Sequence, residues 1–421
     1  MKKAPLGFWS VFSIGVGGMV GGGIFAVLGL TIELAHGGAP IAFLISGLVA
    51  LLSSYSYAHL SVTYPSQGGT VRFLNEAFGI GIFSTSLNIL LCLSYVIMLS
   101  LYSYAFGSYG ASFFDPHWQN GMKHFFISFI IIFITILNIL GAKIVGRTEI
   151  WFVMLKIAIL VIFIAIGLFF SNFKELNPIY WSSTLKLISG GMIIFLAYEG
   201  FELIANTAQD ISNPKQILPY TYYSAVIFVI VLYVTISIVT LGTLKLSQIL
   251  AARDYALASS AKPFLGNAGF ILIAIAALLA TASAINATIY GTTRIMHILA
   301  GTHQLPNFLE AKRSEQLIES SLVLAGLTLV IANGFNLSSI ATMGSAGFLI
   351  IFAAVNFANF KLSQHTHSYK LISLAGMIMC IVSLMVLTIE TLIIAPQKLI
   401  FLLALLGIAL IFGIISQYSN K

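Results

Sequence analysis

A cluster of glycines interrupts the first apolar stretch of the chain, in the sequence Gly15-Val16-Gly17-Gly18-Met19-Val20-Gly21-Gly22-Gly23-Ile24-Phe25. Five of the seven residues from 17 to 23 are glycine. Each glycine makes a helix less stable by up to about 1 kcal/mol relative to alanine. The cluster therefore predicts a helix that unwinds near its middle. Close packing against another helix through small residues is the alternative explanation.

The composition around this stretch is that of a membrane protein. The chain has 421 residues, of which 59% are hydrophobic and 8% are charged. Soluble domains contain roughly 25% charged residues. So apolar a chain cannot be an ordinary soluble enzyme, a disordered chain or a nucleic-acid binder. A bilayer is the solvent that suits it, and we expect an all-α, multi-pass protein of the cell membrane.

The apolar stretches predict about twelve transmembrane helices, because a spanning helix needs about 20 apolar residues. The segments between them are too short to form a sizeable soluble domain. The predicted helices are 7–31, 39–63, 81–112, 122–141, 149–171, 184–209, 217–243, 264–299, 320–334, 337–360, 369–394 and 397–417.

The distribution of basic residues predicts the orientation of these helices. Cytoplasmic loops carry more Lys and Arg than external loops. With the N-terminus inside, twelve of the twenty Lys and Arg residues fall in inner segments and seven in outer segments. Lys156 falls within a helix. This bias predicts that both termini are cytoplasmic.

A second interrupted helix is predicted at 184–209, which contains Phe195-Leu196-Ala197-Tyr198-Glu199-Gly200-Phe201-Glu202. Two blocks of five helices, at about 7–171 and 184–360, therefore each begin with a broken helix. A block with an odd number of spans forces the next block to be inverted in the membrane. Transporters with inverted repeats bind their substrate between two discontinuous helices. We expect one transport core at 1–360 and two peripheral helices and a tail at 361–421.

The chain resembles the amino acid–polyamine–organocation superfamily. The resemblance covers about residues 7 to 360 and implies a five-plus-five inverted repeat and secondary transport of amino acids. Besides the first glycine cluster, its motifs in chain order are His36-Gly37-Gly38-Ala39-Pro40, Tyr64-Pro65-Ser66-Gln67-Gly68-Gly69, Ala77-Phe78-Gly79, Asn213-Pro214, Asn286-Ala287, Thr293-Arg294, Leu305-Pro306 and Val355-Asn356-Phe357-Ala358.

The two breaks predict a site for both charges of an amino acid. The half-helix that starts after Gly21, Gly22 and Gly23 presents unpaired N–H groups and the positive end of its dipole, which suit a carboxylate. Glycines without a Cβ atom let the ligand come close. Unpaired carbonyl groups on the other side of each break can accept an ammonium group, and the candidates are Met19, Leu196 and Glu199.

Three residues of the second break complete the predicted substrate site. Gly200 is the glycine of that break. Tyr198 stands where the resemblance implies an aromatic gate or pocket wall, although core packing explains it equally well. Glu199 is a carboxylate near the bilayer centre, where burial costs roughly 2.5–3.5 kcal/mol. It can face the substrate amine or a cationic side chain, carry a transported proton, or lie beside a water-filled vestibule. Glu202 can share any of these roles.

Lys156 is the candidate for coupling transport to a proton. The resemblance implies a lysine on this helix in some proton-coupled members, where sodium-coupled relatives bind a cation between the first and eighth helices. The alternative is a lysine that extends to the cytoplasmic surface. Ser283 and Asn286 share a face of the eighth helix and are further cation-site or proton-site candidates, with polar contacts between helices as the alternative.

These features predict a secondary active transporter that moves amino acids by alternating access, as a proton-coupled symporter. An amino acid or polyamine exchanger and a non-transporting amino acid sensor are the alternatives. We expect no enzyme activity, no metal and no cofactor, because the chain has neither a metal-ligand motif nor a phosphate-binding G-x-x-x-x-G-K motif. The expected partners are an amino acid, a proton or sodium ion, and lipid. The sequence predicts neither the preferred amino acid nor the oligomeric state.

Overall fold

The computed structural model describes residues 6–140, 145–306, 309 and 318–419, and these segments are helical with no strands. Ten of their helices are long and apolar enough to span a membrane, and one bent pair adds an eleventh. Helix α12 (Ile318–Gly334) is apolar but shorter. The prediction of an all-α membrane protein is therefore confirmed. The count of twelve spans stays a prediction, because it requires α12 to cross the bilayer.

The first helix is broken where the glycine cluster predicts. It consists of α1 (Phe8–Met19) and α2 (Gly23–Ala35), whose axes differ by 43°. The three residues between them, 20–22, are not helical. Both halves are mostly apolar, with Glu33 near the end of α2 as the one charged residue, and α2 is almost entirely buried. The break therefore lies within protein, where irregular backbone at membrane depth is tolerated.

The second broken helix differs from its prediction in position and form. Helix α8 (Thr184–Ile193) changes directly into a long 3₁₀ helix, η3 (Ile194–Asp210). The change falls before the predicted break around Gly200. A long 3₁₀ stretch inside a helix is uncommon and often marks a functional hinge.

The remaining long helices match the predicted segments to within a few residues, except that α6 and α11 begin six and eight residues earlier than predicted. Three short helices, α4, α10 and α14, were not predicted. Helix α11 has a kink at Gly266, whose φ is 62°. Their bounds are α3 (Ala39–Thr63), α4 (Gly69–Phe78), α5 (Ile82–Ala111), α6 (Pro116–Ile139), α7 (Val145–Phe170), α9 (Pro214–Thr243), α10 (Leu246–Ala251), α11 (Ala256–Gly301), α13 (Leu337–Lys361), α14 (Ser363–Thr366), α15 (Lys370–Ile394) and α16 (Gln397–Ser419), with the 3₁₀ turns η1 (Phe173–Leu176), η2 (Pro178–Tyr180) and η4 (Arg253–Tyr255).

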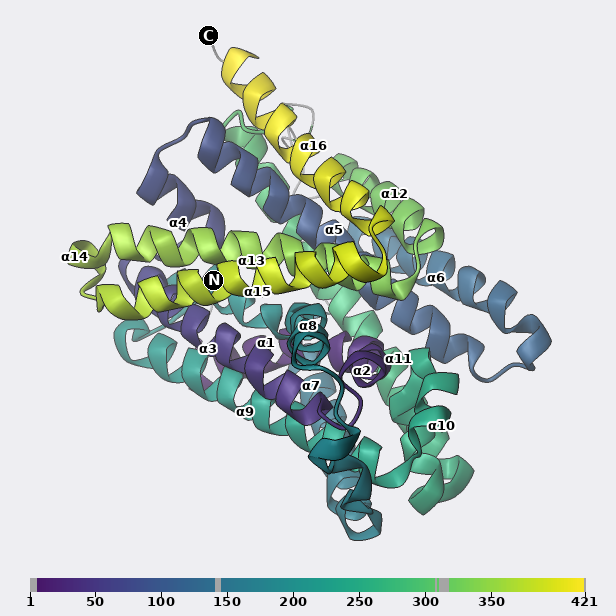
Figure 1. Cartoon of the computed structure of the whole chain (residues 1–421). Helices are drawn as coiled ribbons and strands as arrows, with labels where there is room; N and C mark the ends of the chain where they lie inside the picture. The colour runs from purple at the N-terminus through teal and green to yellow at the C-terminus, as the bar shows by residue number, and fades with distance from the viewer. Residues whose placement is uncertain (1–5, 141–144, 307–308, 310–317, 420–421) are drawn as a thin grey trace.

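Helices that occupy equivalent positions in the two blocks of five are neighbours. Helix α1 packs on η3, α3 packs on α9, and α5 packs on α11. Figure 1 shows α1 and α2 in the interior, with α3 and α9 running alongside each other. This pairing is what an inverted repeat about a pseudo-two-fold axis requires, and it brings the two broken helices together at the centre.

The last two long helices pack against this core. Helix α15 lies beside α13 in Figure 1 and also contacts α3 and α8. Asn356 of α13 joins these helices through buried hydrogen bonds, accepting one from Ser56 at 2.7 Å and donating one to Ser53 at 3.0 Å. Helix α16 packs on α5. The division into a core and two peripheral helices stays a prediction, and α15 has more core contact than that division implies.

The predicted orientation rests partly on residues outside the described segments. Six of the basic residues assigned to the inner side lie there, namely Lys2, Lys3, Lys143, Lys312, Arg313 and Lys421. The cytoplasmic position of both termini therefore stays a prediction. Below, inner and outer follow that predicted orientation.

Candidate functional site

The two broken helices cross with their backbones in contact. A Cβ atom on Gly200 would overlap the backbone of Gly18 and Met19, and one on Gly18 would lie 2.9 Å from the Gly200 carbonyl oxygen. A Cβ atom on Gly23 would lie 2.5 Å from that of Ala197. The glycines of both breaks therefore allow a closer approach than any other residue would, as helix packing through small residues requires.

The carbonyl groups of the first break already accept hydrogen bonds. Gly17 accepts one from the Lys156 ammonium at 3.0 Å, and Met19 accepts one from the Tyr233 hydroxyl at 2.6 Å. The carbonyl of Gly18 accepts hydrogen bonds from the Gly21 N–H at 3.3 Å and from the Tyr102 hydroxyl at 3.5 Å. Met19 is thus placed at the break, as predicted, but its carbonyl has a partner within the protein.

Lys156 is buried and reaches the first broken helix rather than the inner surface. Only 3% of the residue is exposed, and its Nζ donates to the Gly17 carbonyl. Val153, one turn earlier on α7, contacts Gly17, where a Cβ atom would lie 2.8 Å from the valine Cγ2. The structure therefore brings Lys156 to the region where the sequence resemblance places a coupling group.

Glu202 and Glu199 lie on one face of η3, because residues three apart eclipse one another in a 3₁₀ helix. Glu202 is 1% exposed, and its Oε1 accepts hydrogen bonds from Thr70 at 2.7 Å and from Tyr95 at 2.8 Å. Glu199 is 3% exposed, and its Oε2 is buried without a hydrogen-bond partner among the described residues. Glu202 Oε2 is likewise buried without a hydrogen-bond partner among the described residues. The two carboxyl groups therefore differ because two hydrogen bonds, from α4 and α5, hold Glu202 through its Oε1, whereas none among the described residues holds Glu199.

The structure places Leu196 and Tyr198 in packing contacts. The Leu196 side chain lies against Gly344 of α13, and its N–H donates to Ser345 at 3.2 Å. Tyr198 is fully buried, and its hydroxyl donates to the Phe43 carbonyl at 3.0 Å. The Tyr198 ring therefore faces α3 in this conformation, as the core-packing alternative predicted.

The expectation of unpaired carbonyls at Leu196 and Glu199 is wrong in this conformation. Both residues lie inside η3, which continues to Asp210. In a 3₁₀ helix each carbonyl accepts from the N–H three residues further on. The second break thus changes the hydrogen-bond pattern of the helix instead of opening it.

Helix α11 faces the first break with residues other than the predicted pair. Gly21 lies against Ala284, and Gly22 lies against Thr281 and the ring of Tyr102. Asn286 instead accepts a hydrogen bond from Asn138 of α6 at 2.8 Å, as the alternative of polar contacts between helices predicted. The Asn286 amide therefore bonds α6 rather than the break, and no side-chain hydrogen bond joins Ser283 to the break among the described residues.

Sequence reasoning missed two polar side chains that contact the breaks, Tyr233 and Ser345, and a third, Thr70, that bonds the Glu202 carboxyl group. Tyr233 and Ser345 lie in apolar stretches of α9 and α13, where a lone hydroxyl carries no motif. Thr70 directly follows the double glycine at 68–69, so the sequence marked its position without assigning it a role. Their contacts join residues that are far apart in the chain, which periodicity alone does not predict.

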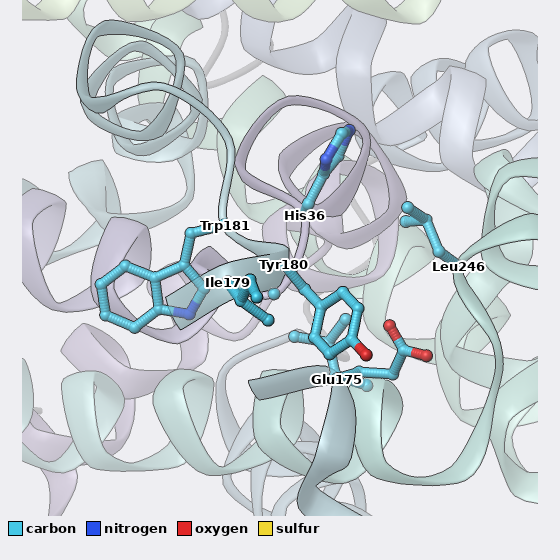
Figure 2. Close-up of a pocket in the computed structure, with 8 residues that line it drawn as sticks. His36, Glu175, Ile179, Tyr180, Trp181 and Leu246 are labelled. Atoms are coloured by element: carbon cyan, nitrogen blue, oxygen red, sulfur yellow. The ribbon is translucent and has the colours of Figure 1, made fainter. Parts of the chain in front are cut away.

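A cavity of about 240 Å³ lies at the outer end of the molecule, away from the breaks. Figure 2 shows the Tyr180 ring and the Glu175 carboxyl group between Trp181 on one side and Leu246 on the other. His36, which follows α2, pairs with Trp181 through a backbone bridge. The loop before α8 therefore covers the outer end of the first broken helix. The cavity is smaller than most ligand sites, which measure about 300–1,000 Å³.

Comparison with known proteins agrees with two crossed, broken helices in an apolar bundle. The model of a family described as amino acid permease matches residues 6–415. The chain belongs to the amino acid permease family. The permease is therefore an amino acid transporter and a multi-pass protein of the cell membrane, as predicted. The superfamily resemblance seen in the sequence is confirmed.

Relatives from archaea and bacteria cover most of the permease. It is 35% identical over 375 residues to the uncharacterized protein MJ0609 of Methanocaldococcus jannaschii, covering 88% of this chain and 85% of the relative. It is 34% identical over 380 residues to the inner membrane transport protein YbaT of Escherichia coli, covering 88% and 87%. A more distant relative is the serine/threonine exchanger SteT of Bacillus subtilis, at 24% identity over 312 residues, covering 72% and 70%.

Proposed function

We propose that this permease accumulates amino acids by proton-coupled symport, with alternating access about its two broken helices. The observation that carries the proposal is the buried hydrogen bond from Lys156 to the Gly17 carbonyl at 3.0 Å. An intramembrane ionisable side chain that contacts the moving element of a transporter is a functional candidate by default. Here that side chain touches the half-helix α1 directly before its break.

Protonation of Lys156 changes the strength of this contact. A hydrogen bond from a charged donor is roughly twice as strong as one between neutral groups. A charged Lys156 therefore holds α1 against α7 at Gly17, and loss of its proton weakens that attachment. The proton and the position of α1 are linked in this way, which is the linkage that symport requires.

The substrate site lies at the crossing of the two breaks. The N–H groups at the start of α2, after Gly21, Gly22 and Gly23, are directed at the α-carboxylate of the amino acid. Gly200 keeps η3 close enough for both breaks to contact one small ligand. Opening on one side at a time requires α1 and α2 to move separately, and the 43° bend between them supplies the hinge.

Uptake of radiolabelled L-amino acids into proteoliposomes tests this proposal. The purified permease is reconstituted and assayed with an inward proton gradient, with a sodium gradient, and with no gradient but internal unlabelled amino acid. Symport predicts accumulation above the equilibrium level with the proton gradient alone. Uptake only in the presence of internal amino acid overturns symport and favours exchange.

Substitution of Lys156 separates coupling from transport. Lys156→Met is expected to abolish accumulation driven by the proton gradient while retaining exchange of labelled for unlabelled amino acid. Lys262→Met, at a lysine whose ammonium lies over the Phe270 ring away from the breaks, is the control and is expected to accumulate normally. Full proton-driven accumulation by Lys156→Met would exclude this lysine as the coupling group.

An amino acid exchanger is the second candidate. The relationship to SteT favours it, because that protein is named as an exchanger. In an exchanger the empty permease does not change orientation, so the same reconstitution distinguishes the two modes directly. Measurable binding without flux in any of the three conditions would instead support a sensor.

A further inference from the structure

At the crossing of the breaks, an arriving ammonium group finds most backbone acceptors already in use. The carbonyls of Gly17, Gly18 and Met19 each accept a hydrogen bond from Lys156, Gly21 or Tyr233 respectively. Those of η3 accept within their own helix. A carbonyl keeps a second lone pair, but none of these groups lacks a partner.

Glu199 offers a side-chain acceptor near the same crossing. Its Oε2 is buried and has no hydrogen-bond partner among the described residues. A buried polar atom without a partner is costly, so each instance in a native protein calls for an explanation. A ligand that donates to this oxygen in the loaded state provides one.

Glu199 lies on the face of η3 that meets α5, because Glu202 on that face accepts a hydrogen bond from Tyr95 of α5. On the same face of η3, Leu196 lies one turn earlier beside Ile97, and Glu202 lies one turn later and bonds Tyr95. Both Ile97 and Tyr95 belong to α5. Glu199 directly precedes Gly200, whose backbone lies against that of Gly18 and Met19 at the first break. The unpartnered oxygen therefore lies within the region where both breaks and α5 meet.

We propose that Glu199 is the specificity-determining residue that binds the ammonium group of the transported molecule. This inference rests on the proposed function and deepens it by naming the chemical group that the site requires. A carboxylate and an ammonium group form a charge-assisted hydrogen bond, which is stronger than a bond from the same group to a carbonyl. The α-carboxylate then faces the start of α2 on the opposite side of the ligand.

This arrangement defines the substrates by their amine. Molecules with a protonated amine bind, whereas a deaminated acid leaves Glu199 unpaired and also brings a second negative charge close to it. An N-acetylated amino acid fails for the same two reasons. An amine that lacks the α-carboxylate keeps the contact with Glu199 and loses only the contact with α2, so it is expected to inhibit transport.

Inhibition of uptake by substrate analogues tests the proposal. The probe is the L-amino acid with the largest uptake in the reconstituted wild type, together with its deaminated acid, its N-acetyl derivative and the amine formed by its decarboxylation. In the wild type, the decarboxylated amine is expected to inhibit more strongly than the deaminated acid. The reverse order would overturn the proposal without any variant.

Two matched variants locate the effect. Glu199→Gln keeps the shape of the side chain and removes its charge, and it is expected to raise KM for the amino acid by about 30-fold or more, as the loss of one partner of a buried charge pair does. Glu199→Gln is also expected to reduce the ratio between the affinity for the amino acid and the affinity for its deaminated acid by a similar factor. Glu202→Gln is the control, because Thr70 and Tyr95 donate hydrogen bonds to the Glu202 carboxyl group. It is expected to leave the ratio of the two affinities unchanged.

The outcomes separate this inference from the proposed function. Absence of uptake by the wild type in every condition overturns the proposed function. A second outcome is that the wild type takes up the amino acid, and that Glu199→Gln prefers the amino acid over its deaminated acid as strongly as the wild type does. This outcome overturns only the role of Glu199. If Glu199→Gln does not transport, a shift in its melting temperature on addition of the same four compounds reports the same order of binding.

Discussion

The two breaks of this permease arise in different ways. The first break, between α1 and α2, falls inside a run of glycines, and residues 20–22 leave the helix there. The second falls between the β-branched residues Ile193 and Ile194, with Gly190 and Gly191 just before it inside the regular turns of α8. At that point Ser345 of α13 donates to the Ile193 carbonyl at 2.8 Å and accepts from the Leu196 N–H at 3.2 Å.

The difference shows that a broken helix can be encoded locally or by a distant partner. Glycines lower the stability of helix wherever they occur, so the first break needs no particular neighbour. The second has a hydroxyl partner far away in the chain, since Ser345 is separated from Leu196 and Ile193 by 149 and 152 residues. Substitutions at each break should therefore have different consequences.

The largest effect is expected from Gly200→Ala, because it pushes the two breaks apart. The new Cβ atom would overlap the backbone of Gly18 and Met19, which cannot move aside as a flexible side chain can. Overpacking of a core costs about 1–3 kcal/mol and occasionally more, and we expect at least the upper end of that range. Thermal unfolding of the purified permease in detergent measures the loss.

Gly326→Ala is the matched control for this change. Gly326 also lies in an apolar helix, α12, and a Cβ atom there would meet nothing within 4 Å. Alanine favours helix over glycine, so this variant is expected to be as stable as the wild type or slightly more stable. Equal melting temperatures for Gly200→Ala and the wild type would show that the breaks do not need their close contact.

A smaller but more local effect is expected from Ser345→Ala, because it removes the partner of the second break. The Leu196 N–H and one lone pair of the Ile193 carbonyl then lose their side-chain partner. An unsatisfied buried polar group costs about 1–3 kcal/mol. Amide hydrogen exchange is expected to increase around residues 193–196 and to stay unchanged around the first break.

Thr342→Ala tests whether this effect is specific. Thr342 lies one turn before Ser345 on α13 and is also buried, but its one hydroxyl bond among the described residues goes to the Ser338 carbonyl of its own helix. It is expected to leave exchange in η3 unchanged. Faster exchange in η3 in both variants would mean that α13 supports the second break by packing rather than through one hydroxyl.

The same distinction explains how much of the fold followed from the sequence. Long apolar stretches predicted the spanning helices, and Ala39–Thr63 was predicted to the residue. The first break was predicted in place because its cause lies in adjacent residues. The second was placed at Gly200, but Gly200 serves the close crossing with Gly18, and the hydrogen-bond pattern changes six residues earlier, where Ser345 acts.

The candidate site divides in the same manner. Lys156, Glu199 and the glycines of the first break were selected because charge at membrane depth and glycine clusters are visible in one dimension. Asn286 was also selected, but its amide bonds Asn138 instead of facing the break. The packing of the helices decides which face of α11 meets the first break. In this structure the packing brings Thr281 and Ala284 to the break.

Tyr233→Phe tests the one hydroxyl that joins the two breaks, and a loss of about 1 kcal/mol is expected, the usual net value of a hydrogen bond. Tyr233 donates to the Met19 carbonyl at 2.6 Å and lies 3.4 Å from that of Ala197. Without it, α1 and η3 are less firmly joined, so KM or the turnover rate should change along with stability.

Tyr222→Phe is the control for Tyr233, because it is also fully buried on α9 and its hydroxyl bonds Ser61 of α3 instead. It is expected to lower stability to a similar extent without altering the kinetics of uptake. Kinetic changes of the same size in both variants would assign the effect to α9 as a whole.

The smallest effect is expected from Arg253→Gln, at the outer end of the first broken helix. Arg253 pairs with Glu33 of α2 at 2.8 Å, but their side chains are 40% and 38% exposed. Exposed ion pairs contribute about 0.2–1 kcal/mol and weaken in salt. The backbone offers a firmer attachment, because Gly29 of α2 lies against the Arg253 carbonyl so closely that a Cβ atom would overlap it.

Arg72 is the control, because it pairs with Glu76 on α4 at 2.6 Å and is also exposed. Removal of the Arg253 charge should therefore lower the stability of the permease no more than removal of the Arg72 charge. Both variants are expected to unfold within about 1 kcal/mol of the wild type, with a difference that disappears in high salt. A loss above about 2 kcal/mol for Arg253→Gln alone would exceed what an exposed pair supplies. It would mean that the charge, and not the glycine contact, holds α2 closed at its outer end.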